Sequence, residues 1–295
     1  MARARIDLIY GGGKGNNVAR ALTRLNVSVI ATGFQGGYSG EFITRQLAAE
    51  GIQTDFVVCQ QPTRTTLMIN EEETGRTYAI YEPGQEIAPD EVVALKCKFR
   101  QLLDTSNLCL LCGSAQTTEA AAIFPELIEI AQARGVKCIL DSSGLALAQG
   151  ICARPHMVKV NSDELSGYLG RPLPGAGDQV AAMQDLQASG IQLVAMTRGS
   201  QGILMTNGAE TWQGVLKMER VINVMGCGDS LLAGIAMGMV LQETLPEIIR
   251  LGVACGAANT QAIGAGFINL VTVASLRPLV QVSHIALDST VRKED

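Results

Sequence analysis

Apolar runs and amphipathic runs alternate along most of the chain. Short, nearly continuous apolar stretches occupy residues 28–33, 107–113, 136–141, 157–161 and 191–197. Between them lie segments whose apolar residues recur every three or four positions, at 40–51, 119–135, 162–170 and 179–190. The first set is typical of strands buried on both faces, and the second of amphipathic helices. The alternation predicts an α/β fold in which helices cover both faces of a mostly parallel sheet.

One segment departs from this alternation. Two β-rich runs, 65–70 and 77–82, flank the turn sequence EEETG and predict an antiparallel hairpin within a single domain that spans 1–295. Apolar residues alternate along both runs: Leu67, Ile69, Tyr78 and Ile80. Because a two-stranded hairpin alone is marginal in water, we expect it to fold onto its own domain or to pair with a second chain.

Composition and charge exclude several classes of protein. The net charge of −5 argues against nucleic acid as the main partner. Eight cysteines lie mostly in apolar runs and no apolar leader follows Met1, so we expect reduced thiols and a cytoplasmic protein. The two histidines have no second ligand at metal spacing. No uncharged apolar run is long enough to span a membrane.

The stretch VMGCGDSLLAGIAMGMV, residues 224–240, joins a glycine turn to an apolar helix. Gly226 and Gly228 allow backbone N–H groups to converge beside a helix N-terminus, which favours an anion. Asp229 would then face that anion, where a carboxylate is repulsive unless it accepts a proton from an attacking hydroxyl. The alternative is that Asp229 is only a favourable acid in the first turn of a helix.

A second glycine-rich stretch, YGGGKGNNVARAL, occupies residues 10–22, and its glycines lead into a helical pattern. It matches neither the P-loop nor G-x-G-x-x-G. Its glycines let the backbone approach a ligand and Lys14 can contact a phosphate, but taken alone the pattern favours a flexible turn before a helix, with Lys14 solvated.

Taken together, the motifs resemble the ribokinase-like (PfkB-type) sugar kinases, in particular the branch of 1-phosphofructokinase, tagatose-6-phosphate kinase and the minor 6-phosphofructokinase. GGKGNNVARAL and GCGDS are similar to the two family signatures, and five minor motifs stand between them in the expected order: PTRTTL, EPGQE, DSSGLAL, KVNSDEL and TRGSQGILM. The resemblance runs from about Gly11 to about Phe267. It implies a three-layer α/β/α sandwich with a mostly parallel central sheet and a small β lid, here shortened.

The resemblance also assigns a role to each matching position. Asp229 matches the catalytic base, and the turn before it matches the anion hole: Gly226, Cys227 and Gly228. Positions that match the sugar-phosphate site are Gly12, Gly13, Lys14, Asn17 and Arg64. Positions that match the nucleotide site are Asn161, Glu164, Thr197, Gly199, Gly202 and Asn259. Within that set, Asn161 and Glu164 match the element that orders Mg²⁺, on which Glu164 acts indirectly, although both residues also suit a helix capping box.

The N-terminus departs from the family pattern. Members usually begin with an Asn-Pro-x-x-Asp strand and a lid segment, whereas RARIDLIY here runs straight into the glycines. Either Asp7 matches the aspartate that binds the sugar hydroxyls and the lid segment is lost, or the first strand is missing altogether. Three further departures are CGSAQTTEA in place of a Gly-Ser-Leu-Pro-x-Gly loop, Val160 in place of Pro, and NVMGCGDS without the usual Pro or Thr.

The resemblance implies an ATP- and Mg²⁺-dependent kinase of a phosphorylated ketohexose. Fructose 1-phosphate is the first choice of substrate, tagatose 6-phosphate the second and fructose 6-phosphate the third. We expect no nucleic-acid or membrane partner, and a homodimer formed through the hairpin. Two other classes stay open: a non-catalytic sugar-phosphate-binding protein whose lid was lost, and a nucleotide-dependent oxidoreductase. The absence of G-x-G-x-x-G after the first strand disfavours the oxidoreductase.

Overall fold

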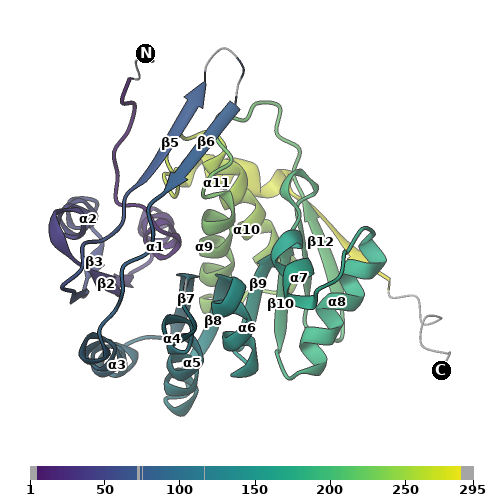
Figure 1. Ribbon diagram of the computed structural model, residues 1–295. Coiled ribbons are helices and arrows are strands. Elements are labelled where there is room, and N and C mark those ends of the chain that lie inside the picture. The colour runs from purple at the N-terminus through teal and green to yellow at the C-terminus, as the bar shows by residue number, and fades with distance from the viewer. Residues whose placement is uncertain (1–4, 72–73, 75, 116, 287–295) are drawn as a thin grey trace.

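The computed structural model describes residues 5–71, 74, 76–115 and 117–286, and a seven-stranded sheet forms its centre (Figure 1). The strand order is β13-β12-β11-β10-β9-β8-β7. Four neighbouring strands are parallel: β7 (Leu108–Ser114), β8 (Lys137–Ser143), β9 (Met157–Asn161) and β10 (Leu193–Thr197). Three more extend the sheet with antiparallel pairing: β11 (Ile203–Thr206), β12 (Thr211–Val215) and β13 (Gln281–Ile285).

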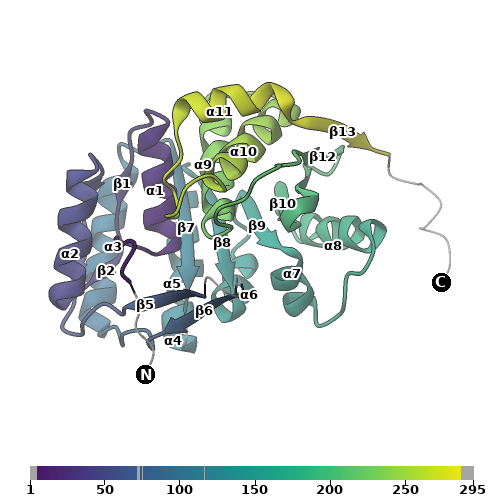
Figure 2. The same cartoon turned by 90° about the horizontal axis from the view of Figure 1, so that it is seen from above.

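Helices cover both faces of this sheet, as the alternating pattern predicts (Figure 2). One layer contains α5 (Ile123–Ala133), α6 (Gly144–Cys152), α7 (Ser162–Leu169) and α8 (Ala176–Ala188), with α3 (Pro89–Leu103) packed beside α5. The other contains α1 (Lys14–Arg24), α9 (Cys227–Val240), α10 (Leu245–Asn259) and α11 (Leu270–Leu276). Each layer has its own apolar core. Cys109 lies in one core and Cys112 packs against the other, as expected for strand residues three positions apart.

Two sequence-based expectations need correction. The run 28–33 was expected to form a buried sheet strand, but only β1 (Ile30–Ala31) forms, and it pairs with β3 (Gln53–Thr54) outside the central sheet. The helix expected over 119–135 is divided into α4 (Thr118–Ala121) and α5. The physical reason for the break is Pro125, which has no N–H for the carbonyl of Ala121 and whose ring crowds that carbonyl.

The remaining elements surround the sheet. β2 (Phe34–Gln35) pairs with β4 (Val57–Val58) next to α2 (Gly37–Ala49). Two short 3₁₀ turns, η1 (Gly199–Gln201) and η2 (Arg277–Leu279), follow β10 and α11. No helix in the described part of the chain is long and apolar enough to cross a membrane.

The predicted hairpin is confirmed. β5 (Thr66–Glu71) pairs antiparallel with β6 (Arg76–Tyr81) and stands apart from the central sheet (Figure 1). Leu67 pairs with Ile80 and Ile69 with Tyr78, so the four apolar side chains share one face. All four are more than a third exposed. The hairpin therefore presents an uncovered apolar face.

Candidate active site

The carboxyl ends of β8 and β9 meet the N-termini of α1 and α9, which pack against each other (Figure 1). Ligands of open α/β sheets bind at such an edge, because strand ends and helix N-termini converge there. The two glycine motifs lie more than two hundred residues apart in sequence, and the fold brings them together at this point.

The N-terminus of α9 has the backbone geometry that favours a bound anion. Gly226 is its N-cap with a φ of 75°, and a Cβ there would lie 2.3 Å from the Cβ of Ala265, so only glycine fits. In the described part of the chain, no acceptor faces the backbone N–H groups of Gly228 and Asp229. These unpaired donors and the helix dipole favour a negatively charged group at this position.

Asp229 is held inside this site rather than on its surface. Its exposed fraction is 7%, and its Oδ2 accepts a hydrogen bond from Asn17 Nδ2 at 2.8 Å. Burial raises the pKa of Asp229, and nearby Asp141 adds to that rise, while the Asn17 hydrogen bond, Lys159 and Lys14 oppose it. A buried carboxylate with a raised pKa is suited to accept a proton.

Two lysines share one fully buried carboxylate beside Asp229. Asp141 Oδ1 lies 3.0 Å from Lys14 Nζ, and its Oδ2 lies 3.0 Å from Lys159 Nζ. Lys159 Nζ would lie 3.2 Å from a Cβ placed on Gly228, so its ammonium group borders the α9 anion site. Burial lowers the pKa of Lys14, but the carboxylates of Asp141 and Glu164 outweigh it and raise that pKa, so Lys14 is charged.

Sequence reasoning did not assign Asp141 and Lys159 to the site. Both lie in motifs quoted above, DSSGLAL and KVNSDEL. The signal was a charged residue inside an otherwise apolar strand, since such residues are rarely buried unless they are paired. Only the register of β8 against β9 makes the two charges neighbours.

Asn161 and Glu164 form a capping box at the start of α7. The Glu164 N–H donates to Asn161 Oδ1 at 2.7 Å, and the Asn161 N–H donates to Glu164 Oε2 at 2.8 Å. The other carboxylate oxygen, Oε1, lies 3.3 Å from Lys14 Nζ. One oxygen of Glu164 is thus used by the helix, and the other faces the site.

Asn259 is fully buried, and all its hydrogen bonds are made within the protein. Its amide donates to the Met225 carbonyl and to Cys227 Sγ, and its Oδ1 accepts from Ser230 Oγ and the Gly266 N–H. These bonds tie α10 to the start of α9 and to the loop after α10. The Asn259 amide is thus fully used within the protein, and its place at the nucleotide site stays a prediction.

Cys227 occupies the middle of the anion turn. Its thiol donates to the Asn223 carbonyl at 3.8 Å. Burial raises the pKa of the Cys227 thiol, and Asp229 adds to the rise, while the Asn259 hydrogen bond opposes it. The thiol is therefore neutral at physiological pH and does not repel an incoming anion.

The expected nucleotide loop lies at the end of β10. Thr197 closes that strand, and Gly199 begins η1 with a φ of 57°. A Cβ on Gly202 would lie 2.0 Å from the Gly214 carbonyl oxygen of β12. Packing against β12 therefore requires glycine at position 202 whether or not a nucleotide binds there.

The residues expected at the sugar-phosphate site are divided between two places. Gly12 and Gly13 precede α1, next to the Asp229 cluster. Arg64 instead lines a cavity of about 610 Å³ at the base of the hairpin, together with Ser39, Thr63, Glu82 and neighbouring residues. Neither Lys14 nor Asp229 lines that cavity.

Asp7 does not join the site. Residues 5–10 form no strand, and the Asp7 carboxylate pairs with Arg5 Nε at 2.7 Å in a solvent-exposed position. The choice between the two alternatives for the N-terminus stays a prediction.

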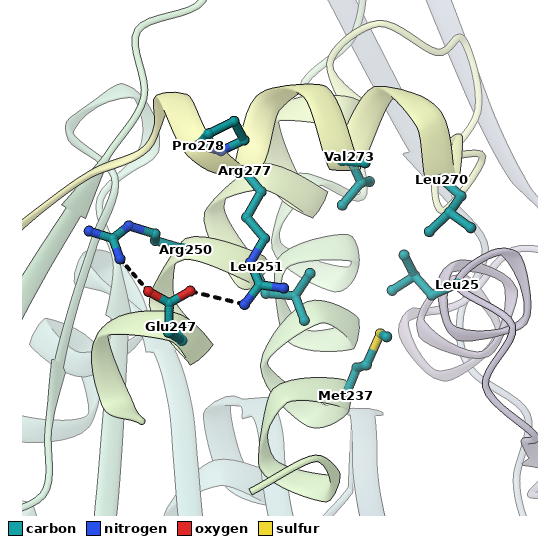
Figure 3. A pocket seen from close by; sticks show the side chains of 10 residues that line it. Leu25, Met237, Glu247, Arg250, Leu251, Leu270, Val273, Arg277 and Pro278 are labelled. Carbon is teal, nitrogen blue, oxygen red and sulfur yellow. Dashed lines mark hydrogen bonds and ion pairs between the residues drawn. The ribbon is translucent and has the colours of Figure 1, made fainter. Parts of the chain in front are cut away.

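A second cavity, of about 570 Å³, lies at the far end of α9, close to Met237 (Figure 3). With a rise of 1.5 Å per residue, Met237 is about 12 Å along the helix from Asp229. Glu247 on the cavity wall bridges Arg250 and Arg277. The charges of this wall are thus already paired with one another.

Comparison with known proteins identifies the chain. The family model described as pfkB family carbohydrate kinase matches residues 8–272. The chain belongs to this family. It is 32% identical to a 1-phosphofructokinase of Rhodobacter capsulatus, with 95% of this chain and 90% of that protein covered. It is 30% identical to a tagatose-6-phosphate kinase of Staphylococcus epidermidis, with 88% and 84% covered.

Solved structures agree with this assignment. The phosphofructokinase-2 of Escherichia coli in complex with fructose-6-phosphate aligns with a TM-score of 0.85 and 28% identity, covering 94% of this chain and 89% of that one. The chain is therefore a carbohydrate kinase, a phosphotransferase, and the oxidoreductase interpretation is set aside. Among the described residues, no three or more His, Cys, Asp or Glu side chains are grouped to hold a metal ion by themselves.

Proposed function

We propose that the protein transfers the γ-phosphoryl group of ATP to a hydroxyl of a phosphorylated ketohexose, with fructose 1-phosphate as the first candidate. The observation that carries the proposal is the placement of Asp229. Its carboxylate is buried, burial raises its pKa, and it lies next to unpaired backbone N–H groups of α9. The names of the relatives support a hexose phosphate as acceptor. Tagatose 6-phosphate and fructose 6-phosphate remain alternatives.

In the proposed reaction Asp229 accepts the proton of the attacking hydroxyl. The N–H groups of Gly228 and Asp229, together with the Lys159 ammonium, stabilise the negative charge of the group in transfer. Lys14 exchanges one of its carboxylate partners for a phosphate oxygen. Both lysines are held close to this position before substrate arrives, because Asp141 pairs with each of them.

The residues present also fit a nucleotide with its metal. Mg²⁺ prefers oxygen ligands and usually keeps several waters, and Glu164 Oε1 is an oxygen on the site side of α7. We assign Glu164 to orient Mg²⁺ through water, and Mg²⁺ when bound would neutralise phosphate charge. For the adenine base we assign the exposed apolar side chains of Val224 and Ile263. Their loops are joined by a hydrogen bond from Asn223 Nδ2 to the Ile263 carbonyl.

Arg64 is the proposed ligand of the phosphate that the sugar already carries. Its guanidinium is exposed at the cavity below the hairpin, and it has no ion-pair partner among the described residues. Because the hairpin connects to that cavity, the proposed sugar site lies between β5–β6 and α9. The uncovered apolar face of the hairpin supports a homodimer through residues 65–82.

The test is a coupled assay of the purified protein. ATP consumption is measured with fructose 1-phosphate, tagatose 6-phosphate, fructose 6-phosphate and free fructose as acceptors. Turnover with one of the three phosphates far above that with free fructose supports the proposal. Binding of a sugar phosphate without any ATP turnover would instead favour the non-catalytic alternative, for which the open hairpin is the motivating observation.

A further inference from the structure

Arg20 is a fully buried arginine on α1, one turn after Asn17. Its guanidinium pairs with the Glu50 carboxylate through Nε and Nη2. It also donates to the Gly11 carbonyl at 2.9 Å, to the Ala265 carbonyl at 3.2 Å and to Asn17 Oδ1 at 3.3 Å. A buried guanidinium is costly unless its donors are used. Here the acceptors are Glu50, at the end of α2, and three groups beside the proposed active site.

Aromatic rings hold this guanidinium in place. Its central carbon lies 4.6 Å from the centre of the Phe267 ring and 5.3 Å from that of Tyr10. The two rings contact each other edge to face, with centres 5.6 Å apart. The contacts combine cation–π attraction with shielding from water, so the direction of the guanidinium donors is fixed.

The fixed donors determine which way the Asn17 amide faces. An arginine side chain carries only donors, whereas an asparagine amide has an acceptor oxygen at one end and two donors at the other. Because Arg20 faces one end of the amide, that end must be the oxygen. The NH₂ group is then left to donate to Asp229 Oδ2, at 2.8 Å. A flipped amide would place its oxygen against the carboxylate and its NH₂ against the guanidinium.

We propose that Arg20 is a positioning residue for the phosphoryl-transfer reaction: it orients the Asn17 amide, which in turn orients the Asp229 carboxylate. This inference rests on the proposed role of Asp229 as the base. Arg20 also joins the backbone of the glycine loop at Gly11 to the loop at Ala265, against which Gly226 packs. One side chain thus links both glycine motifs of the sequence.

The inference predicts a change in pH dependence. Groups that face Asp229 come from five elements: Lys14 and Asn17 on α1, Cys112 on β7, Asp141 on β8, Lys159 on β9 and Cys227 on α9 itself. The Asn17 hydrogen bond lowers the pKa of Asp229 more than Lys159 or Lys14 does. Losing the orientation of the Asn17 amide removes that effect, so the acid limb of kcat/KM moves to higher pH.

The first experiment compares Arg20→Met with Arg24→Met. Arg24 lies on the same helix and stacks on the same Phe267 ring, at 5.2 Å, but it has no hydrogen bond to Asn17. We expect Arg20→Met to lower kcat by about tenfold to a hundredfold, as for a lost hydrogen bond to a charged group. Its KM for ATP should stay close to that of the wild type. Arg24→Met should retain the wild-type kcat and pH profile, and equal behaviour of the two variants would overturn the inference.

Asn17→Asp provides a test that does not depend on removing the buried guanidinium. An aspartate keeps an oxygen facing Arg20 but cannot donate to Asp229 from its ionised form. The expected result is a lower kcat and an acid limb at higher pH, and an unchanged pH profile would refute the proposal even if Arg20→Met failed to fold. In an Asn17→Ala background, Arg20→Met should lower kcat by less than about threefold, since both changes break one chain of contacts. A fully multiplicative loss would mean that Arg20 acts elsewhere.

Asp229→Asn, assayed beside these variants, separates this inference from the proposed function. If Asp229→Asn turns over like the wild type, the assignment of the base fails. If it is inactive while Arg20→Met matches Arg24→Met, the base stands and only the positioning role of Arg20 is lost. Arg20→Lys completes the set. It keeps a cation beside Glu50 without the planar fork, and we expect it to recover folding but not the wild-type kcat.

Discussion

The cluster around Asp229 and the hairpin β5–β6 differ in how far their side chains are buried and paired. Asp229 is 7% exposed, and the side chains next to it each have a fixed partner. On the hairpin, Leu67 and Ile80 face each other across the strands and are both 55% exposed. One region is complete as folded, whereas the other has an apolar face with nothing over it among the described residues.

The difference follows from what each region has to do. Phosphoryl transfer depends on donors and a base that are already in place, since reorganising charges during the reaction raises the barrier. Such a site is stable only when helices and strands bury it. We propose that the hairpin is the lid of this site. A lid must open for substrate, so it cannot be packed permanently into the core. The hairpin is thus the region expected to depend on ligand or on a second chain.

The largest effect is expected from a substitution in the buried cluster around Asp229. Asp229→Asn should lower kcat by about 10²–10⁴-fold with little change in nucleotide affinity, because a general base is lost but the α9 donors remain. Steady-state kinetics and nucleotide titration check this. The matched control is Asp163→Asn, an exposed acid in the first turn of α7 that should be silent. Near wild-type turnover of Asp229→Asn would mean that Asp229 is only a helix-terminal acid.

The next largest effect is expected from a substitution at the base of the hairpin. Arg64→Met should lower kcat/KM for the sugar phosphate by about 10- to 150-fold, the effect of losing a charge-assisted contact with a phosphate. Free fructose carries no phosphate, so its much smaller kcat/KM should stay unchanged. Arg45→Met serves as control, since Arg45 is an exposed arginine on α2 paired with Glu41. An equal loss with both acceptors would remove Arg64 from the phosphate site.

A third measurement uses pH to sharpen the contrast. Asp229 accepts a proton only when it is ionised, and burial raises its pKa above the ordinary value for aspartate. Activity is therefore present above the raised pKa and is lost as the pH falls through it, by about tenfold in kcat/KM per pH unit below it. The acid limb should lie above the value of about 3.9 for an unperturbed aspartate. A limb at or below that value would contradict the buried, poorly hydrated site.

Substitutions on the hairpin are expected to change the oligomeric state and to have the smallest effect on stability. Leu67→Thr combined with Ile80→Thr keeps good strand formers but removes the apolar face. We expect the variant to lose dimerisation at micromolar concentration in sedimentation experiments, with little change in Tm, because both side chains are already exposed. Val58→Thr, at an exposed strand position outside the hairpin, is the control. A wild-type protein that sediments as a monomer would exclude the dimer.

The hairpin, as the proposed lid, also predicts imperfect coupling. Its apolar face is uncovered among the described residues, so we expect water to reach the proposed phosphoryl site and some ATP to be hydrolysed without sugar phosphorylation. Parallel measurement of ADP and sugar bisphosphate gives the ratio. Strict one-to-one coupling would mean that the hairpin closes fully over bound substrate.

Local sequence patterns determined much of the fold. Apolar runs and amphipathic periodicity were enough for β7 to β10, α2, α7 and α8, because those patterns reflect burial on two faces or one. The hairpin followed from alternation around a turn. The short β1 and the break at Pro125 were missed: strand length depends on neighbours in space, and the effect of the proline was overlooked in an otherwise helical pattern.

For the site, sequence alone predicted which residues carry the chemistry: Asp229 behind two glycines, Lys14 behind three, and a resemblance that links them. Only the tertiary structure decided how they are held. Asp141 and Lys159 become neighbours through strand register, Asn259 uses all its hydrogen bonds inside the protein, and Arg20 reaches both glycine loops. The physical reason is that hydrogen bonds and ion pairs act over a few ångströms in space. Residues separated by a hundred or more positions meet only once the sheet and its helices have formed.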